Sequence, residues 1–148
     1  MPNRFAALLL MFAAVGCGTQ TRMYSVSVKN DTGGPLTLDL TKDGPPTEDA
    51  WASPEDIADG RVKVSADTRL GFNTLQAGAT QTANDIPGKF DSGIHALLRV
   101  YRGGNLQVNE MLAIKPGPNR QDMVLAPGGN SFVVHDKAGQ LSLEPAIP

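Results

Sequence analysis

The chain of 148 residues has one cysteine, two histidines and one tryptophan. A single cysteine excludes a disulfide within the chain, so stability must come from an apolar core and backbone hydrogen bonds. Neither His95 nor His135 belongs to a spaced ligand motif such as H-E-x-x-H. The sequence therefore predicts no metal site and no cofactor.

The chain also lacks a strong excess of charge of either sign, since it has 13 Lys and Arg residues and 15 Asp and Glu residues. A nucleic-acid-binding domain shows a basic surplus or stripe, so we expect no nucleic-acid partner. The later part of the chain is richer in basic residues, namely Lys89, Arg99, Arg102, Lys115 and Arg120. Such charges can face an anionic membrane or a partner, but on strands they more often keep the outer face of a sheet in water.

Signatures of catalysis are missing as well. No G-x-S-x-G elbow occurs, and the glycine pairs at 103–104 and 128–129 lack the lysine and the following helix of a phosphate loop. Asp91, Ser92 and His95 lie close in sequence, but neighbouring residues of a strand point to opposite faces. We therefore expect no catalytic residues.

Long hydrophobic runs are absent except at the N-terminus. Met1–Arg4 is a short basic start, Phe5–Val15 is apolar, and the run ends in Ala14-Val15-Gly16-Cys17. The run is too short for a transmembrane helix of about 20 residues, but it suits a signal h-region of roughly 7 to 15. An ordinary secretory signal would be cleaved at the same bond, but it would leave an unexplained lone thiol.

This segment resembles the signal peptide and lipobox of bacterial lipoproteins, although Ala14 stands where leucine is most frequent. The resemblance implies that residues 1–16 are removed and that Cys17 becomes an acylated N-terminus. It also implies a cell-envelope protein held at a membrane by its lipid, and at the outer membrane in a Gram-negative organism, because Gly18 follows the cysteine. Several acyl chains give stable anchoring, whereas one gives only reversible binding.

The mature chain has the size of one domain, with residues 17–22 as a tether and 23–148 as the folded part. Apolar residues alternate with polar ones at 24–29 and 36–41, which predicts two strands with one buried and one wet face. The turn-rich segment 30–35 between them predicts a hairpin.

Further strands are expected at 61–67, 70–75, 94–101, 106–114, 122–126, 131–135 and 141–143, with hairpins at 101–105 and 135–139. Short strands with frequent turns predict an all-β fold, an antiparallel β-sandwich of about seven to nine strands with one short helix in a long loop. An open barrel is the alternative. The segment 76–93 is polar without clear alternation and is expected to break the strand pattern.

The long connection 43–60 is the candidate binding loop. Ser53-Pro54 predicts a helix start, and Gly60 can end that helix after little more than a turn. The tryptophan of the chain, Trp51, lies in this loop with the acidic residues Glu55, Asp56 and Asp59. Long loops and tryptophan are both frequent at binding sites, but a lone tryptophan is modest evidence, and the favoured interpretation is that Trp51 plugs one end of the sandwich. Calcium binding is disfavoured because no D-x-[DN]-x-[DN]-G series occurs.

These features predict a membrane-anchored envelope lipoprotein that acts as a non-catalytic binding or structural module, with another envelope protein as its partner. The alternatives are an envelope hydrolase with a dispersed active site and a carbohydrate-binding module. The chain has few aromatic residues for stacking on a sugar.

Overall fold

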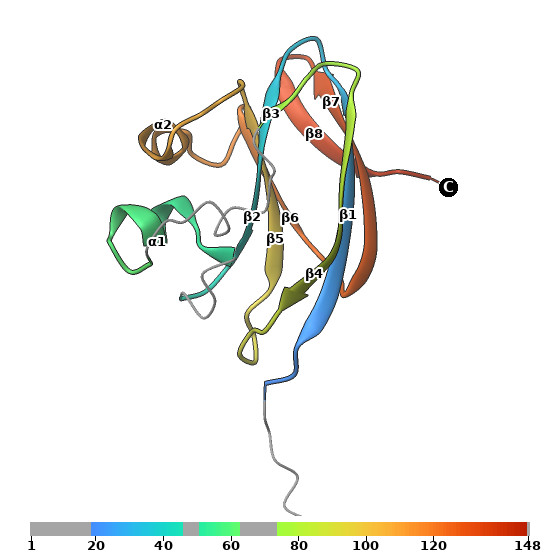
Figure 1. The fold of residues 1–148 in the computed structure, drawn as a ribbon. Helices are drawn as coiled ribbons and strands as arrows, with labels where there is room; N and C mark the ends of the chain where they lie inside the picture. The colour runs from blue at the N-terminus through green and yellow to red at the C-terminus, as the bar shows by residue number, and fades with distance from the viewer. Residues whose placement is uncertain (1–18, 46–50, 63–73, 148) are drawn as a thin grey trace, which may run out of the picture.

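Two four-stranded β-sheets face each other across an apolar core (Figure 1). The computed structural model describes residues 19–45, 51–62 and 74–147. The elements are β1 (Arg22–Asp31), β2 (Leu36–Lys42), α1 (Pro54–Ala58), β3 (Thr74–Leu75), β4 (Thr80–Gly88), β5 (Ala96–Arg102), α2 (Val108–Ala113), β6 (Arg120–Val124), β7 (Gly128–Lys137) and β8 (Gln140–Pro145).

The strand order is β4-β1-β7-β8 in one sheet, called here the β1 sheet, and β3-β2-β5-β6 in the other, the β2 sheet. The predicted all-β sandwich with a short helix in the long loop is confirmed. Two features differ from the expectation. β1 pairs with β7 in parallel, whereas the other pairs are antiparallel, and a second short helix is present. Adjacent parallel strands need a long crossover connection between them. Here the connection from β1 to β7 includes all the strands of the β2 sheet.

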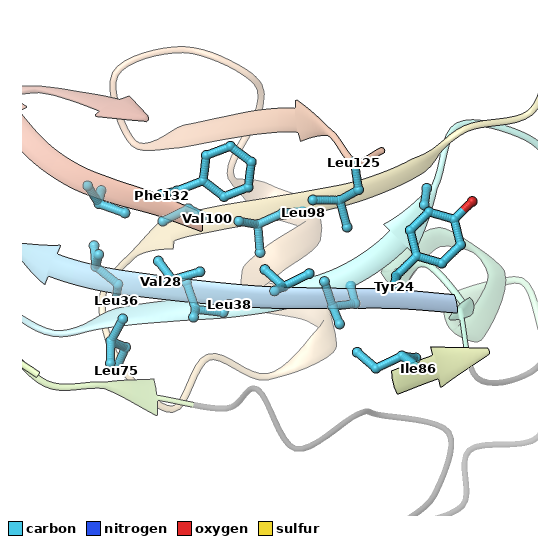
Figure 2. Packing of buried hydrophobic residues seen from close by; sticks show 14 of the residues in the cluster. Tyr24, Val28, Leu36, Leu38, Leu75, Ile86, Leu98, Val100, Leu125 and Phe132 are labelled. Atoms are coloured by element: carbon cyan, nitrogen blue, oxygen red, sulfur yellow. The ribbon is translucent and has the colours of Figure 1, made fainter. Parts of the chain in front are cut away.

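The core lies between the sheets and is built from the residues that alternate along the first two strands. Tyr24, Val26 and Val28 of β1 are buried, and Leu36, Leu38 and Leu40 of β2 are buried opposite them (Figure 2). The other large members of this cluster are Trp51, Leu75, Ile86, Leu98, Val100, Leu125, Phe132, Val134 and Leu141. The period-two pattern thus identified the inward face of both strands.

The predicted hairpin at 30–35 is wrong, because β1 and β2 belong to different sheets. The side chain of Asn30 is fully buried and donates to the carbonyl oxygens of Gly34 and Leu75, each over 2.9 Å. The hydroxyl of Thr32 donates to the side-chain oxygen of Asn30 over 2.7 Å. These side-chain bonds stabilise a turn that carries the chain from one sheet to the other instead of a strand ladder.

The predicted strand at 106–114 is also wrong, and with it the hairpin at 101–105. This segment leaves the sheet and forms α2, in which Glu110 accepts a hydrogen bond from the backbone N–H of Gln107 over 2.7 Å. Glu, Met, Leu and Ala in this stretch favour a helix, and Met111 alone in it is buried. The segment expected as a strand is therefore a short helix with one inward residue.

The segment 76–93 contains the strand β4, which the sequence did not predict. β4 is an edge strand with mostly exposed polar residues, and its register with β1 shifts between Tyr24 and Val26. An irregular strand that is wet on most positions gives no clean period. The final hairpin at 135–139 is confirmed between β7 and β8.

Some predictions fall partly or wholly outside the described residues. Cys17 lies outside them. Most of the strands expected at 61–67 and 70–75 also lies outside them, and the described end of the second is β3, Thr74–Leu75. β1 begins at Arg22, the last residue of the expected tether. Neither helix in the described part of the chain is long and apolar enough to cross a membrane.

Candidate functional site

Helix α1 stands in the predicted binding loop and begins as the sequence indicates. The Ser53 hydroxyl accepts a hydrogen bond from the Asp56 backbone N–H over 3.1 Å, and the Asp56 carboxylate accepts one from the Ser53 N–H over 3.1 Å. Pro54 occupies the first turn, and Gly60 follows the C-terminal cap with φ +68°. This reciprocal capping stabilises a helix of barely more than one turn.

Trp51, at the start of this segment, is fully buried. Its ring lies edge-on to Tyr24 and Phe90, with centroid separations of 5.4 and 5.2 Å. Its Nε1–H donates to the carbonyl oxygen of Pro87 over 2.9 Å. The indole therefore closes one end of the core, and a partner of this loop would meet the acidic side chains instead.

Beneath α1 lies an ion pair that is removed from solvent. The Nζ of Lys42 is 2.5 Å from the Oδ2 of Asp56, and the side chains are 0% and 4% exposed. Burial alone raises the pKa of Asp56, but Lys42 and the Ser53 N–H outweigh it, so the pKa lies below its ordinary value. The pair fastens α1 to the end of β2.

A second ion pair connects α1 with β5 and β6. The Nη1 of Arg99 donates to the Oε2 of Glu55 over 2.9 Å, and its Nε lies 3.4 Å from the Oδ2 of Asp122. Asp122 in turn accepts two hydrogen bonds from Arg120, of 2.9 and 2.7 Å. Burial raises the pKa of Glu55, but its own backbone N–H and Arg99 outweigh this, and the pKa is lowered.

These charges lie on the outer face of the β2 sheet, which the alternating pattern predicts to be wet. In the structure Thr37, Asp39 and Thr41 are buried, as are Arg99 and Tyr101 on the neighbouring strand. The reason is that α1 and α2 lie over this face (Figure 1). Burial, together with the charge of Asp39, raises the pKa of Tyr101 to about 12.

A groove of about 650 Å³ opens between α1 and the β2 sheet. Its charged lining residues are Lys42, Asp43, Glu55, Asp56, Arg61, Arg99 and Asp122. Asp59 lies beside it and pairs with Arg61 over 2.8 Å, with both side chains about half exposed. Of the acidic candidate residues, Asp56 is therefore buried and holds α1 in place through Lys42. Glu55 and Asp59 are half exposed and can contact a partner.

The two histidines lie apart, His95 in the loop before β5 and His135 on β7, and each contacts a carboxylate. The Nδ1 of His95 is 2.7 Å from Asp43, and the Nδ1 of His135 is 3.3 Å from Asp31. Within the described residues neither ring has a hydrogen bond to a serine or threonine hydroxyl. In that same part of the chain no three His, Cys, Asp or Glu side chains gather as a metal ligand set.

Sequence reasoning missed Lys42 and Arg99 as members of this site. One signal was available for Arg99, because it interrupts the apolar run of 96–100. A strand that is apolar at consecutive positions is buried on both faces, so a charge within it needs a partner. Lys42 follows the buried leucines of β2 without a comparable signal.

No family model matches this sequence, and no curated protein matches it. Among solved structures, the crystal structure of the T6SS lipoprotein TssJ1 from Pseudomonas aeruginosa is similar at 12% sequence identity and a TM-score of 0.37. The match covers 87% of this chain and 99% of that chain. A likeness of this degree assigns neither a family nor a function to this chain.

Proposed function

We propose that this protein is a lipid-anchored module of the bacterial cell envelope, which binds another envelope protein through the groove between α1 and the β2 sheet and catalyses no reaction. The observation that carries the proposal is the anchoring of α1. The buried Lys42–Asp56 pair holds the helix in place, and the buried Arg99 adds a bond to Glu55. The carboxylates of Glu55 and Asp59 remain 49% and 53% exposed at its surface.

The construction of this helix supports a recognition role. An isolated helix of five residues is far too short to be stable, so its position depends on the contacts below it. A preorganised surface loses little conformational entropy when a partner binds. A helix held in place by the buried Lys42–Asp56 pair therefore provides a preorganised binding surface.

The alternatives have less support. A hydrolase needs a nucleophile, a base and an orienting acid in contact, and the histidine pairs of the described residues contain no nucleophile. A sugar platform needs exposed aromatic rings. In residues 19–45, 51–62 and 74–147 every aromatic ring is buried or half-buried.

The lipid anchor and its localisation rest on the N-terminal pattern that ends in Cys17. The test is the intact mass of the protein from the membrane fraction of its native host. A mature N-terminus at Cys17 with the mass of acyl chains is expected, together with a soluble, unmodified Cys17→Ser variant. An unmodified thiol in the wild type would disprove the anchor.

The binding surface can be tested with a photo-crosslinking amino acid in place of Asp59 or of Asp31. These positions are 53% and 51% exposed, but they lie on the α1 surface and on the opposite sheet. We expect a defined adduct with one envelope protein from position 59 and none from position 31. Equal adducts from both positions, or none from position 59, would contradict the proposed surface.

A further inference from the structure

A second pocket, of about 310 Å³, lies at the end of the sandwich where the tether enters. The residues of this pocket come from the chain just before β1 and the start of β1, and from the end of β4 and the loop that follows it. These two segments lie side by side at this end in Figure 1. Its polar lining includes Gln20, Arg22, Asp91, Ser92 and His95. The candidate binding groove at α1 has its own set of lining residues and shares none of these five.

Arg22 is a cation without a partner in the described part of the chain. No carboxylate of these residues pairs with its guanidinium. Burial raises the pKa of the nearby Tyr24 hydroxyl, and the charge of Arg22 opposes that rise. A guanidinium has five N–H donors in a planar fork that matches the oxygens of a phosphate. The pocket therefore offers an open anion-binding group, with the Ser92 hydroxyl as a further donor.

The same pocket also contains an anion. Asp91 lines it, and in the described residues no cation pairs with its carboxylate. One unpaired positive group and one unpaired negative group in a single pocket fit a ligand that carries both charges. A bare phosphate would meet the repulsion of Asp91, whereas an ammonium group attached to the phosphate would be attracted by it.

The backbone gives this pocket a fixed shape. A Cβ at Gly88 would come within 2.7 Å of Phe90 and 2.9 Å of Tyr24, so glycine there lets two aromatic rings close the floor. The loop then turns at Gly93 with φ +84°, and the Ile94 N–H donates to the Asp91 carbonyl oxygen over 3.1 Å. Asp91 is thus held on a turn packed against the core, and Arg22 is held by the start of β1.

The position of the pocket identifies the source of such a ligand. Gln20 is three residues from Cys17, and three extended residues span at most about 11 Å. If the proposed acylation at Cys17 places that residue at a bilayer surface, the pocket lies within reach of the lipid headgroups.

We propose that this pocket binds the phosphate–ammonium headgroup of a membrane phospholipid, with Arg22 on the phosphate and Asp91 on the ammonium. This proposal rests on the proposed lipid anchor for its location. Headgroup binding would orient the domain on the membrane, with this end of the sandwich against the bilayer.

The test uses the acylated protein, reconstituted in nanodiscs of phosphatidylethanolamine or of phosphatidylglycerol, with hydrogen exchange of residues 89–95 as the readout. We expect at least several-fold slower exchange in phosphatidylethanolamine, because only that lipid carries an ammonium group. Arg22→Gln should abolish the difference. Lys29→Gln is the matched control, since Lys29 is an exposed cation on the same strand, and it should keep the difference.

Two further measurements separate the possible sources. Soluble phosphoethanolamine and inorganic phosphate are titrated separately against the mature protein in neutral detergent, with Cys17 in whichever state its mass shows. Slower exchange with phosphoethanolamine supports the headgroup chemistry even where the mass of Cys17 disproves the anchor. Equal protection by inorganic phosphate would mean a phosphate site without an ammonium subsite and would overturn the proposal. Equal exchange in both lipids, or a wild-type response in Arg22→Gln, would overturn it as well.

Discussion

The indole Nε1–H of Trp51 donates a hydrogen bond of 2.9 Å to the carbonyl oxygen of Pro87, which joins the α1 segment to β4, the edge strand of the opposite sheet. The same segment is held on its other side by the Lys42–Asp56 pair at the end of β2. The segment 51–58, which includes α1, is therefore bonded to both layers of the sandwich. Its position depends on the tertiary structure as a whole.

Trp51→Ala should destabilise the protein by about 3–5 kcal/mol, because it removes a fully buried ring and leaves a cavity between Tyr24 and Phe90. Urea unfolding followed by far-ultraviolet circular dichroism measures this loss of stability, because the variant lacks the tryptophan that a fluorescence assay would need. Ile147→Ala, at a side chain 93% exposed, is the control and should change stability by less than about 0.5 kcal/mol. A Trp51→Ala effect as small as the control would contradict the packing described.

The buried pair should show strong coupling in a double-mutant cycle. Lys42→Met and Asp56→Asn should each cost about 3–5 kcal/mol, because each leaves a charge buried without its partner. The double variant should be more stable than the sum of the two effects predicts, by at least about 1 kcal/mol. Strict additivity in the same unfolding assay would show that the two charges do not interact.

Acid should weaken the attachment of α1. The folded-state pKa of Asp56 lies below its ordinary value of 3.8, so its contribution is complete above that value and disappears as the pH falls through the lower, folded-state pKa. The stability difference between wild type and Asp56→Asn should therefore be constant above about pH 5 and shrink below pH 4. Unfolding free energies across this range provide the measurement. A difference that stays constant down to pH 2 would refute the assignment.

Alkali should act through Tyr101, with the opposite sign. Its pKa is raised from 10.0 to about 12, so its contribution is complete below pH 10 and is lost as the pH rises toward 12. The loss amounts to roughly 3 kcal/mol at about 1.4 kcal/mol per pH unit. Tyr101→Phe should flatten the dependence of stability on pH above pH 10. In the folded wild type, the tyrosinate absorbance of Tyr101 should rise only at a pH above 10.0, the ordinary pKa of tyrosine. A tyrosine that titrates normally at pH 10 would require Tyr101 to be solvated.

Local patterns predicted the parts of the fold that local chemistry decides. The inward faces of β1 and β2 follow from the alternation at 24–28 and 36–40, and the start of α1 follows from Ser53 and Pro54. The same patterns failed where partners lie far away in the chain. The turn around Asn30 looks like a hairpin, but a bond to Leu75, 45 residues along, belongs to a crossing between sheets.

By itself, the sequence determined the all-β class, the inward residues of the first strands and the capped helix of the long loop, because each depends on residues within a few positions. It also carries the pattern ending in Cys17, on which the expected anchor rests. What covers the second face of the β2 sheet, and which residues pair with Arg99, follows only from the tertiary structure. The apolar run 96–100 hints that β5 is buried on both faces, but the helices α1 and α2 over it and the partners Glu55 and Asp122 come from distant segments. Burial is a property of what packs on a residue, and that packing joins segments that have no contact in the sequence.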